Sequence, residues 1–489
     1  MVRTWVTALA LVGLLASTAG AQDAKTVLAN AARAMGVEGL NSIHYYGTGA
    51  NGNLGQNNNA NQPWPLAAAN DYVRAIDFTQ PASRATWATY AVPVTGGPAA
   101  LGQGQQNITP ANQAWAQQLE IWITPWGFLK GAMANTATAR SQTVDGARYQ
   151  VVTWNPAAKS PGGSAYRVVG YINNQNLVER VQTWVENPIF GDMLVEARYA
   201  NYRDSNGLKF PASVSQIRGG HPFFMAYILG AHANPSNLQA LMTVPPPPAG
   251  RGGGPPGGGP GQAAAGPTSE KLAEGVFRIN GAYNALAVEF ADHILLFEPG
   301  PQNEARAQAI IAETKRVIPN KPIRYGVISH HHFDHTSGLP AVVAEGITIV
   351  TPEVNRLFLL NALSAPRTLA PDSMSKSGKK PQIEGFTGDR RVFQDGTRTF
   401  EVHVIKGLPH ADGLVVGYLP KEKLLVYADM FNLPPAATPV PSPPVVGTMV
   451  FADNLDRLKL DVERIMSVHS LNPDRLTSVA DIRASLGRK

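Results

Sequence analysis

The chain has 489 residues, of which 44% are hydrophobic, and this length and composition predict a folded protein of two or three domains. The formal net charge is +6, but the 41 lysine and arginine residues are spread along the chain, so no nucleic-acid-binding surface is indicated. Cysteine is absent, which excludes disulfides, thiolate metal ligands and a cysteine nucleophile.

The N-terminal segment has the pattern of a secretory signal peptide. Arg3 precedes an apolar run from Trp5 to Ala16, and the small residues Ala19, Gly20 and Ala21 follow. The run is short for a membrane anchor, so we expect residues 1–21 to be cleaved after Ala21. No later stretch has the length and apolarity of a transmembrane helix. The sequence therefore predicts a periplasmic or secreted protein without stable membrane insertion.

Residues 22–244 are expected to form an α+β domain. A helix is predicted over residues 23–35, with Gly36 at its C-cap, and a second helical segment over 113–134. The Asn-, Gly- and Pro-rich residues 51–65 are typical of a polar loop. Residues 43–47 begin a strand-like region, and alternating stretches follow at 71–77 and 84–90. Alternating patterns then predict a meander of strands at residues 149–154, 166–172, 178–184, 194–199 and 210–217. Together they predict a curved antiparallel sheet with one or two helices, an architecture that periplasmic lipoprotein carriers share by analogy of fold alone.

Residues 245–268 consist largely of proline and glycine. Such a segment cannot bury a core, so it is expected to be an extended linker between domains. Its glycines do not form a phosphate-binding loop, because no Gly-Lys-Ser/Thr motif is present and no strand or helix flanks them.

The sequence pattern changes at residue 269, and residues 269–489 are expected to form a second domain. The predicted strands lie at residues 275–279, 285–290, 294–297, 323–329, 347–350, 399–405, 413–419, 424–428 and 466–468. The predicted helices lie at residues 305–317, 338–344, 356–363, 453–465 and 480–486, with Asp453 as an N-cap. Residues 365–391 read as a long polar insertion.

The densest group of chemistry-bearing residues follows the strand predicted at 323–329. Residues 329–335 read Ser-His-His-His-Phe-Asp-His, which places four of the chain's 11 histidines in six positions. Because a strand shows alternate residues on one face, His330 and His332 are expected to point together, with Asp334 and His335 on the following turn. This spacing could supply two ligands to one metal ion and two to a neighbouring one. His331 alternates away from that face and is not expected to ligate.

Three further candidate ligands stand at strand ends. His410 lies in a turn between two predicted strands, Asp429 ends the apolar strand 424–428, and His469 follows the last short strand. Single residues at strand ends are common, so each has a purely structural alternative. His403 lies within a strand and is expected to be a core residue or a residue that supports the site.

This succession of motifs resembles the metallo-β-lactamase superfamily over residues 270–489. The resemblance implies an αββα sandwich with a pair of metal ions at one edge. It implies that His330, His332 and His410 hold the first ion, that Asp334, His335 and His469 hold the second, and that Asp429 bridges the two. Glu298-Pro299-Gly300 stands where the family usually has Asp-x-Gly, a position that supports the site without ligating metal.

The expected cofactor is a pair of zinc ions, although the same nitrogen and oxygen ligands also accept iron or manganese. Zinc lowers the pKa of a bound water to about 7, which suits hydrolysis at neutral pH. Asp334 is the expected catalytic residue, orienting the attacking water and accepting its proton. The partner would be a small-molecule substrate.

The bond that is cleaved stays open at this stage. β-Lactamases with this signature generally lack a bridging aspartate, so Asp429 favours an ester-like, thioester, lactone, amide or phosphodiester bond. A β-lactamase-like hydrolase is the first alternative. The second is a periplasmic protein that binds a hydrophobic ligand in its first domain and carries a degenerate enzyme domain. The segments 365–391 and 434–446 are expected to flank the site.

Overall fold

The computed structural model describes residues 23–91, 100–244, 268–435 and 438–488. The predicted signal peptide, residues 1–21, and all of the predicted linker except residue 268 lie outside the described residues. Within the described part of the chain, no helix is long and apolar enough to cross a membrane.

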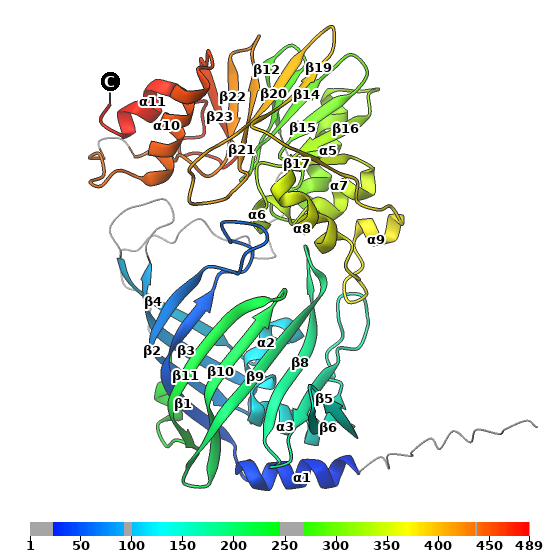
Figure 1. Cartoon of the computed structure of the whole chain (residues 1–489), viewed down its shortest axis with the longest axis vertical. Coiled ribbons are helices and arrows are strands. Elements are labelled where there is room, and N and C mark those ends of the chain that lie inside the picture. Colours follow the sequence, from blue (N-terminus) through cyan, green and yellow to red (C-terminus); the bar gives the residue numbers. More distant parts are fainter. Residues whose placement is uncertain (1–22, 92–99, 245–267, 436–437, 489) are drawn as a thin grey trace, which may run out of the picture.

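The N-terminal half is built on one large, strongly curved antiparallel sheet (Figure 1). In sheet order, its described strands are β4 (Ala100–Ile108), β3 (Ala82–Ala91), β2 (Leu66–Asp77), β1 (Ser42–Gly52), β11 (His221–Ala233), β10 (Leu208–Arg218), β9 (Gly191–Ser205), β8 (Val178–Asn187), β7 (Val168–Ile172), β6 (Ala147–Trp154) and β5 (Thr138–Val144). The predicted meander is therefore present. The pairing of β1 with β11 joins strands β1 to β4 to the rest of the sheet. The sequence patterns did not predict β4, β5 or β11.

Three helices pack against this sheet in one core, and a short fourth helix, α4 (Leu238–Met242), follows β11. They are α1 (Ala24–Met35), α2 (Trp115–Trp122) and α3 (Pro125–Ala134). Asp23 caps α1, which ends at the left-handed Gly36 as predicted, and Thr124 caps α3 with Pro125 in its first turn. Their apolar faces join the inner face of the sheet in one core that includes Trp115, Trp126 and Phe128.

The C-terminal half contains two further sheets. The first consists of β12 (Ser269–Ala273), β13 (Val276–Ile279), β14 (Ala285–Glu289), β15 (Ile294–Phe297), β16 (Ile323–Val327), β17 (Thr348–Pro352) and β18 (Ile383–Phe386). The second consists of β19 (Arg390–Gln394), β20 (Thr399–Val404), β21 (Val415–Leu419), β22 (Leu424–Tyr427) and β23 (Arg464–Ser467). The first is antiparallel from β12 to β15 and parallel from there to β18.

Helices cover the outer faces of these two sheets (Figure 1). Over the first sheet lie α5 (Glu304–Val317), α7 (Leu339–Glu345), α8 (Glu353–Leu363) and α9 (Ser373–Ser377). Over the second lie α10 (Val446–Leu458) and α11 (Val479–Ser485). A core with members such as Phe297, Val327, Phe400 and Val426 contains side chains of both sheets. The predicted mixture of helices with large antiparallel sheets is thus confirmed.

Two local predictions outside the histidine motif are wrong. The helix predicted over residues 453–465 is α10, which begins at Val446 and ends at Leu458. Burial of Phe451 and Leu455 against the second sheet decides its position, and Asp453 instead pairs with Arg488. The segment 365–391 is more than a polar insertion, because it contains α9, β18 and the start of β19.

Candidate metal centre

The motif at residues 329–335 follows strand β16 of the first sheet and contacts the N-terminal half. Strand β16 ends at Val327, so His330 and His332 lie on a loop and not on the strand as predicted. The short helix α6 (Phe333–Thr336) then carries Asp334 and His335. The loop nevertheless brings the rings of His330 and His332 together, with their centroids 4.5 Å apart.

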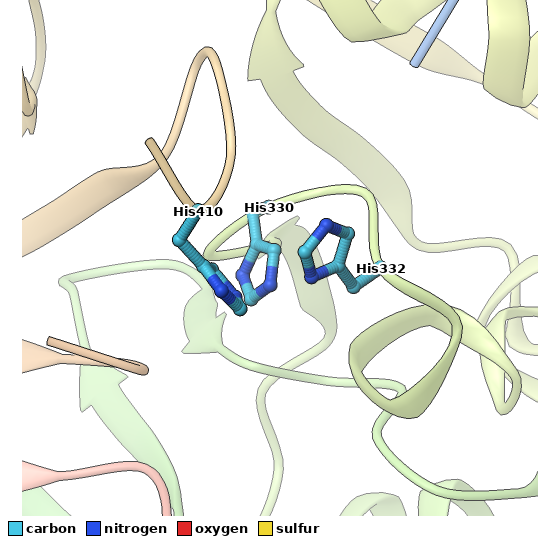
Figure 2. Close-up of side chains that lie close together, drawn as sticks. All are labelled: His330, His332 and His410. Carbon is cyan, nitrogen blue, oxygen red and sulfur yellow. The ribbon is translucent and has the colours of Figure 1, made fainter. Parts of the chain in front are cut away.

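A first group consists of His330, His332 and His410 (Figure 2). One ring nitrogen from each lies within 4.8 Å of the others, and His410 comes from the loop between β20 and β21. His330 and His332 are almost fully buried. His330 Nε2, His332 Nδ1 and His410 Nε2 are buried without a hydrogen-bond partner among the described residues. Ser329 Oγ lies 3.1 Å from the other ring nitrogen of His330, Nδ1.

A second group consists of Asp334, His335 and His469, and its ligand atoms also lie within 4.8 Å of one another. His469 follows β23, on the second sheet. Asp429 follows β22 and stands between the groups. Its Oδ2 lies 2.8 Å from His335 Nε2 and 3.4 Å from His330 Nε2, and its Oδ1 lies 2.7 Å from His469 Nε2. The structure therefore brings all seven sequence-predicted residues into one cluster.

The two groups differ in charge. Burial lowers the pKa of His330 well below its ordinary value, lowers that of His332 to about 3, and also lowers that of His410. These imidazoles are therefore neutral at pH 7 and carry free lone pairs. Burial opposes the charged form of His335 as well, but the carboxylates of Asp429 and Glu298 outweigh it and raise the His335 pKa well above its ordinary value.

The carboxylates of the second group remain ionised. Burial works to raise the pKa values of Asp334 and Asp429, but the hydrogen bonds and charge of His335 outweigh it and hold both below the usual range. The second group is therefore already ion-paired, with His335 as the cation among the neighbouring carboxylates.

Two supporting residues complete the second group. Glu298 is fully buried; its Oε1 lies 2.8 Å from His335 Nδ1, and its Oε2 accepts the backbone N–H of Ser329 at 3.2 Å. Tyr283 donates its hydroxyl to Asp334 Oδ2 at 2.9 Å, and its ring packs against His469. Glu298 was expected to support the site, whereas no spacing or motif signalled Tyr283.

The other two histidines singled out in the sequence lie outside these groups. His331 is in none of the metal-capable clusters of the described chain, and its Nε2 donates to the carbonyl oxygen of Asn57 at 2.8 Å. His403 is buried on β20, where its Nε2 lies 2.8 Å from Glu401 Oε2.

Residues of the N-terminal half also reach the cluster, which the sequence did not predict. The loop between β1 and β2, residues 53–65, contacts the loops that carry His332 and His410 (Figure 1). Residues 366–369, in the supposed insertion, make a second contact between the halves: Arg367 donates to the carbonyl oxygens of Pro188 and Ile189.

The donor set suits a metal ion. Three buried ligand atoms, the imidazole nitrogens of the first group, lack a hydrogen-bond partner among the described residues. The carboxylate of Asp429 lies beside them, with its Oδ2 3.4 Å from His330 Nε2. An unpartnered buried polar atom is costly in a folded protein, and a cation bound among these atoms would remove that cost. Imidazole and carboxylate ligands without thiolates fit zinc, iron or manganese.

The C-terminal half is similar to proteins of a known family. Residues 279–467 match the family model described as "Metallo-beta-lactamase superfamily". No curated protein matches the chain. The similar solved structures include metallo-β-lactamases from Pontibacter korlensis (17% identity, TM-score 0.34) and Hirschia baltica (15% identity, TM-score 0.33), which cover 45% and 46% of this chain and 97% of each of those chains. FIM-1 from Pseudomonas aeruginosa has 14% identity and a TM-score of 0.32, over 46% of this chain and 94% of its own.

The family assignment rests on the family model and on the succession of motifs, not on these structural similarities. The matched region contains all the clustered residues except His469, which follows it by two positions. Residues 279–467 of this chain belong to the metallo-β-lactamase superfamily.

Proposed function

We propose that this protein is an exported, metal-dependent hydrolase with a dinuclear zinc site in a catalytic domain spanning residues 269–489. The two sheets and their outer helices would form the αββα sandwich of the superfamily. Residues 22–244 would form a separate N-terminal domain. The observation that carries the proposal is the convergence of three buried, unpartnered imidazole nitrogens of the first group beside the carboxylate of Asp429.

The residues divide between two ions. His330, His332 and His410 would hold the first ion through neutral nitrogens, and Asp334, His335 and His469 would hold the second. Asp429 contacts both groups and would bridge them. When bound, the metal ions would supply Lewis acidity and lower the pKa of water.

The remaining chemistry belongs to side chains of the chain. Asp334 is an ionised carboxylate whose Oδ2 accepts the Tyr283 hydroxyl, so it would be held ready to orient the attacking water and take its proton. Burial raises the pKa of Tyr283 above its usual range, so this phenol keeps its proton and remains a donor. Glu298 fixes the ring of His335.

The proposed substrate is a small molecule with an ester-like, thioester, lactone, amide or phosphodiester bond. The proposed bridging role of Asp429 is the reason for placing these bonds ahead of a β-lactam. A hydrolysis screen across lactam, lactone, thioester and phosphodiester substrates, with a chelated control, identifies the bond. Preferential hydrolysis of lactams would make β-lactamase-like activity the correct reading.

Metal analysis and two variants test the site. We expect about two equivalents of zinc after metal-supplemented purification, and less than one equivalent would contradict the proposal. His332→Ala and Asp334→Ala are each expected to abolish hydrolysis while the N-terminal half stays folded, as judged by thermal unfolding. His44→Ala is the matched control, because His44 lies on β1 and stacks on His232, outside the cluster. Unchanged turnover in His332→Ala or Asp334→Ala would refute the assignment.

A second candidate function concerns the N-terminal half. A cavity of about 360 Å³ lies beside α2 and α3, with Trp115, Trp122 and Trp154 among its lining residues. Aromatic cavities of this size accept small apolar ligands. Binding of an apolar fluorescent probe that Trp122→Ala abolishes, in a protein that hydrolyses nothing in the screen, would favour a ligand-binding protein with a degenerate enzyme domain.

A further inference from the structure

The loop between β1 and β2, residues 53–65, is docked onto the metal-ligand loops at the level of the backbone. The Phe333 N–H donates to the carbonyl oxygen of Gly55 at 3.2 Å, next to His332. Near His410, the Asp412 N–H donates to the carbonyl oxygen of Asn58 at 2.6 Å, and Asn58 Nδ2 donates to the carbonyl oxygen of Pro409 at 2.7 Å. One loop of the N-terminal half therefore spans the two segments that supply the first group.

The carbonyl oxygen of Asn57 defines which nitrogen of His332 is free. His332 Nε2 lies 2.9 Å from this oxygen. A carbonyl oxygen can only accept, so the imidazole must carry its proton on Nε2. In the neutral ring the lone pair is then on Nδ1, which is buried without a partner among the described residues. The N-terminal half thus selects the tautomer in which His332 can ligate.

The neighbouring residue, Gln56, acts on the second group. Its Nε2 donates to Asp334 Oδ1 at 2.8 Å, while Tyr283 occupies Asp334 Oδ2. The two donors, one from each half of the chain, fix the rotation of the carboxylate. Gln56 and Asn57 therefore touch one proposed ligand of each ion.

The loop has internal features that keep these groups in place. The side chain of Asn57 is buried, and its Nδ2 donates to the carbonyl oxygens of Asn59 and Gln62 at 2.7 and 2.9 Å. Gly55 has φ +80°, and a Cβ there would lie 2.2 Å from the ring of Phe333. That ring, from the metal motif itself, packs edge-on against Trp64 of the same loop.

We propose that Gln56 and Asn57 are positioning residues of the metal centre, so that the N-terminal half completes the outer shell of a site whose ligands all lie in the C-terminal half. This inference rests on the proposed function, because it assigns the loop a role towards the bound ions. Outer-shell partners of metal ligands typically change metal affinity by about 10- to 100-fold when they are removed. The N-terminal half would then help to position the metal ligands, in addition to binding any small molecule in its own cavity.

The test measures binding of Co²⁺ and Zn²⁺ to the full chain, by competition with a chromophoric chelator and by the visible spectrum of bound Co²⁺. Gln56→Ala removes the donor to Asp334, and Asn57→Ala removes the two hydrogen bonds that shape the loop around its carbonyl oxygen. We expect each variant to bind metal about 10- to 100-fold more weakly. We also expect an altered Co²⁺ spectrum, which a general loss of stability does not produce.

Asn61→Ala is the matched control. Asn61 lies in the same loop, and its side-chain amide also reaches across to the C-terminal half, where it donates to the carbonyl oxygen of Val354 at 3.1 Å. Its removal should leave affinity and spectrum unchanged. If Gln56→Ala and Asn57→Ala bind Co²⁺ with wild-type affinity and spectrum, the inference is overturned while the proposed function stands. If the wild-type protein itself binds neither ion, the proposed function falls and the inference falls with it.

Discussion

The two ligand groups of the cluster meet the cost of burial in opposite ways. In the first group, three neutral imidazoles each present a buried nitrogen without a partner among the described residues. In the second group the ligand atoms already have partners: His335 lies between Glu298 and Asp429, and Asp334 accepts from Gln56 and Tyr283. The first group therefore offers nitrogen lone pairs without a partner, whereas the ligand atoms of the second group are already ion-paired or hydrogen-bonded.

This difference predicts how each group responds to metal. An ion entering the first group displaces no ion pair, so its binding has little to undo. An ion entering the second group must displace the proton of His335 and the contact between His335 and Asp429. We therefore expect the first group to bind metal more tightly and the second to bind it with release of a proton.

The largest expected effect separates the two groups by removing one histidine from each. His469→Ala should retain about one equivalent of zinc, because the first group stays intact. His410→Ala should retain less than one equivalent at the same free zinc concentration, because only two ligands of the first group remain and the second group is still ion-paired. Metal analysis measures both after equilibration against zinc buffered to a level at which the wild type holds about one equivalent. Equal retention by the two variants would contradict the difference between the groups.

The next effect tests the charge network of the second group through folding stability. Glu298 is fully buried against His335, and removing one partner of a buried ion pair typically costs about 3–5 kcal/mol. Glu298→Ala should therefore lower the free energy of unfolding of the metal-free protein by about that amount. Denaturant unfolding measures it.

The chain offers a matched control for this variant. His403 and Glu401 form a second histidine–glutamate pair, also at 2.8 Å, on strand β20. Glu401 is more exposed than Glu298 and also pairs with Arg390, so Glu401→Ala should cost less and leave zinc retention unchanged. A larger loss of stability in Glu401→Ala than in Glu298→Ala would show that Glu298 has no special role at the site.

The proposed ligands of both groups could be predicted from the sequence, because each lies in a short motif or at the end of an apolar strand. His330 to His335 are adjacent in the chain. Asp429 and His469 follow strands whose apolar residues indicate burial. The expected alternation along a strand failed for His330 and His332, because the strand ends at Val327 and a loop carries both. Their rings still lie together, because the two residues are only two positions apart in the chain.

The supporting residues could not be predicted for a physical reason. Gln56 and Asn57 lie in a stretch whose asparagines and glycines are typical of a solvated loop, and only the tertiary fold brings it against residues 330–335. Tyr283 lies between two strands and acts through one hydroxyl. A hydrogen bond between residues far apart in the chain leaves no periodic pattern. The helix α10 shows the same limit, since its packing overrode the capping signal of Asp453.

The smallest effect concerns the single hydroxyl of Tyr283. Tyr283→Phe removes one donor from Asp334 and leaves the first group untouched, so zinc retention at the first group should not change. A hydrogen bond to a charged group contributes about 1.5 kcal/mol at the lower end, which corresponds to a roughly tenfold slower hydrolysis. Tyr149→Phe is the control, because Tyr149 donates to Glu179 at the same distance, 2.9 Å, within the N-terminal half. If both variants turn over substrate at the wild-type rate, Asp334 does not depend on Tyr283, and its orientation comes from Gln56 and His335 alone.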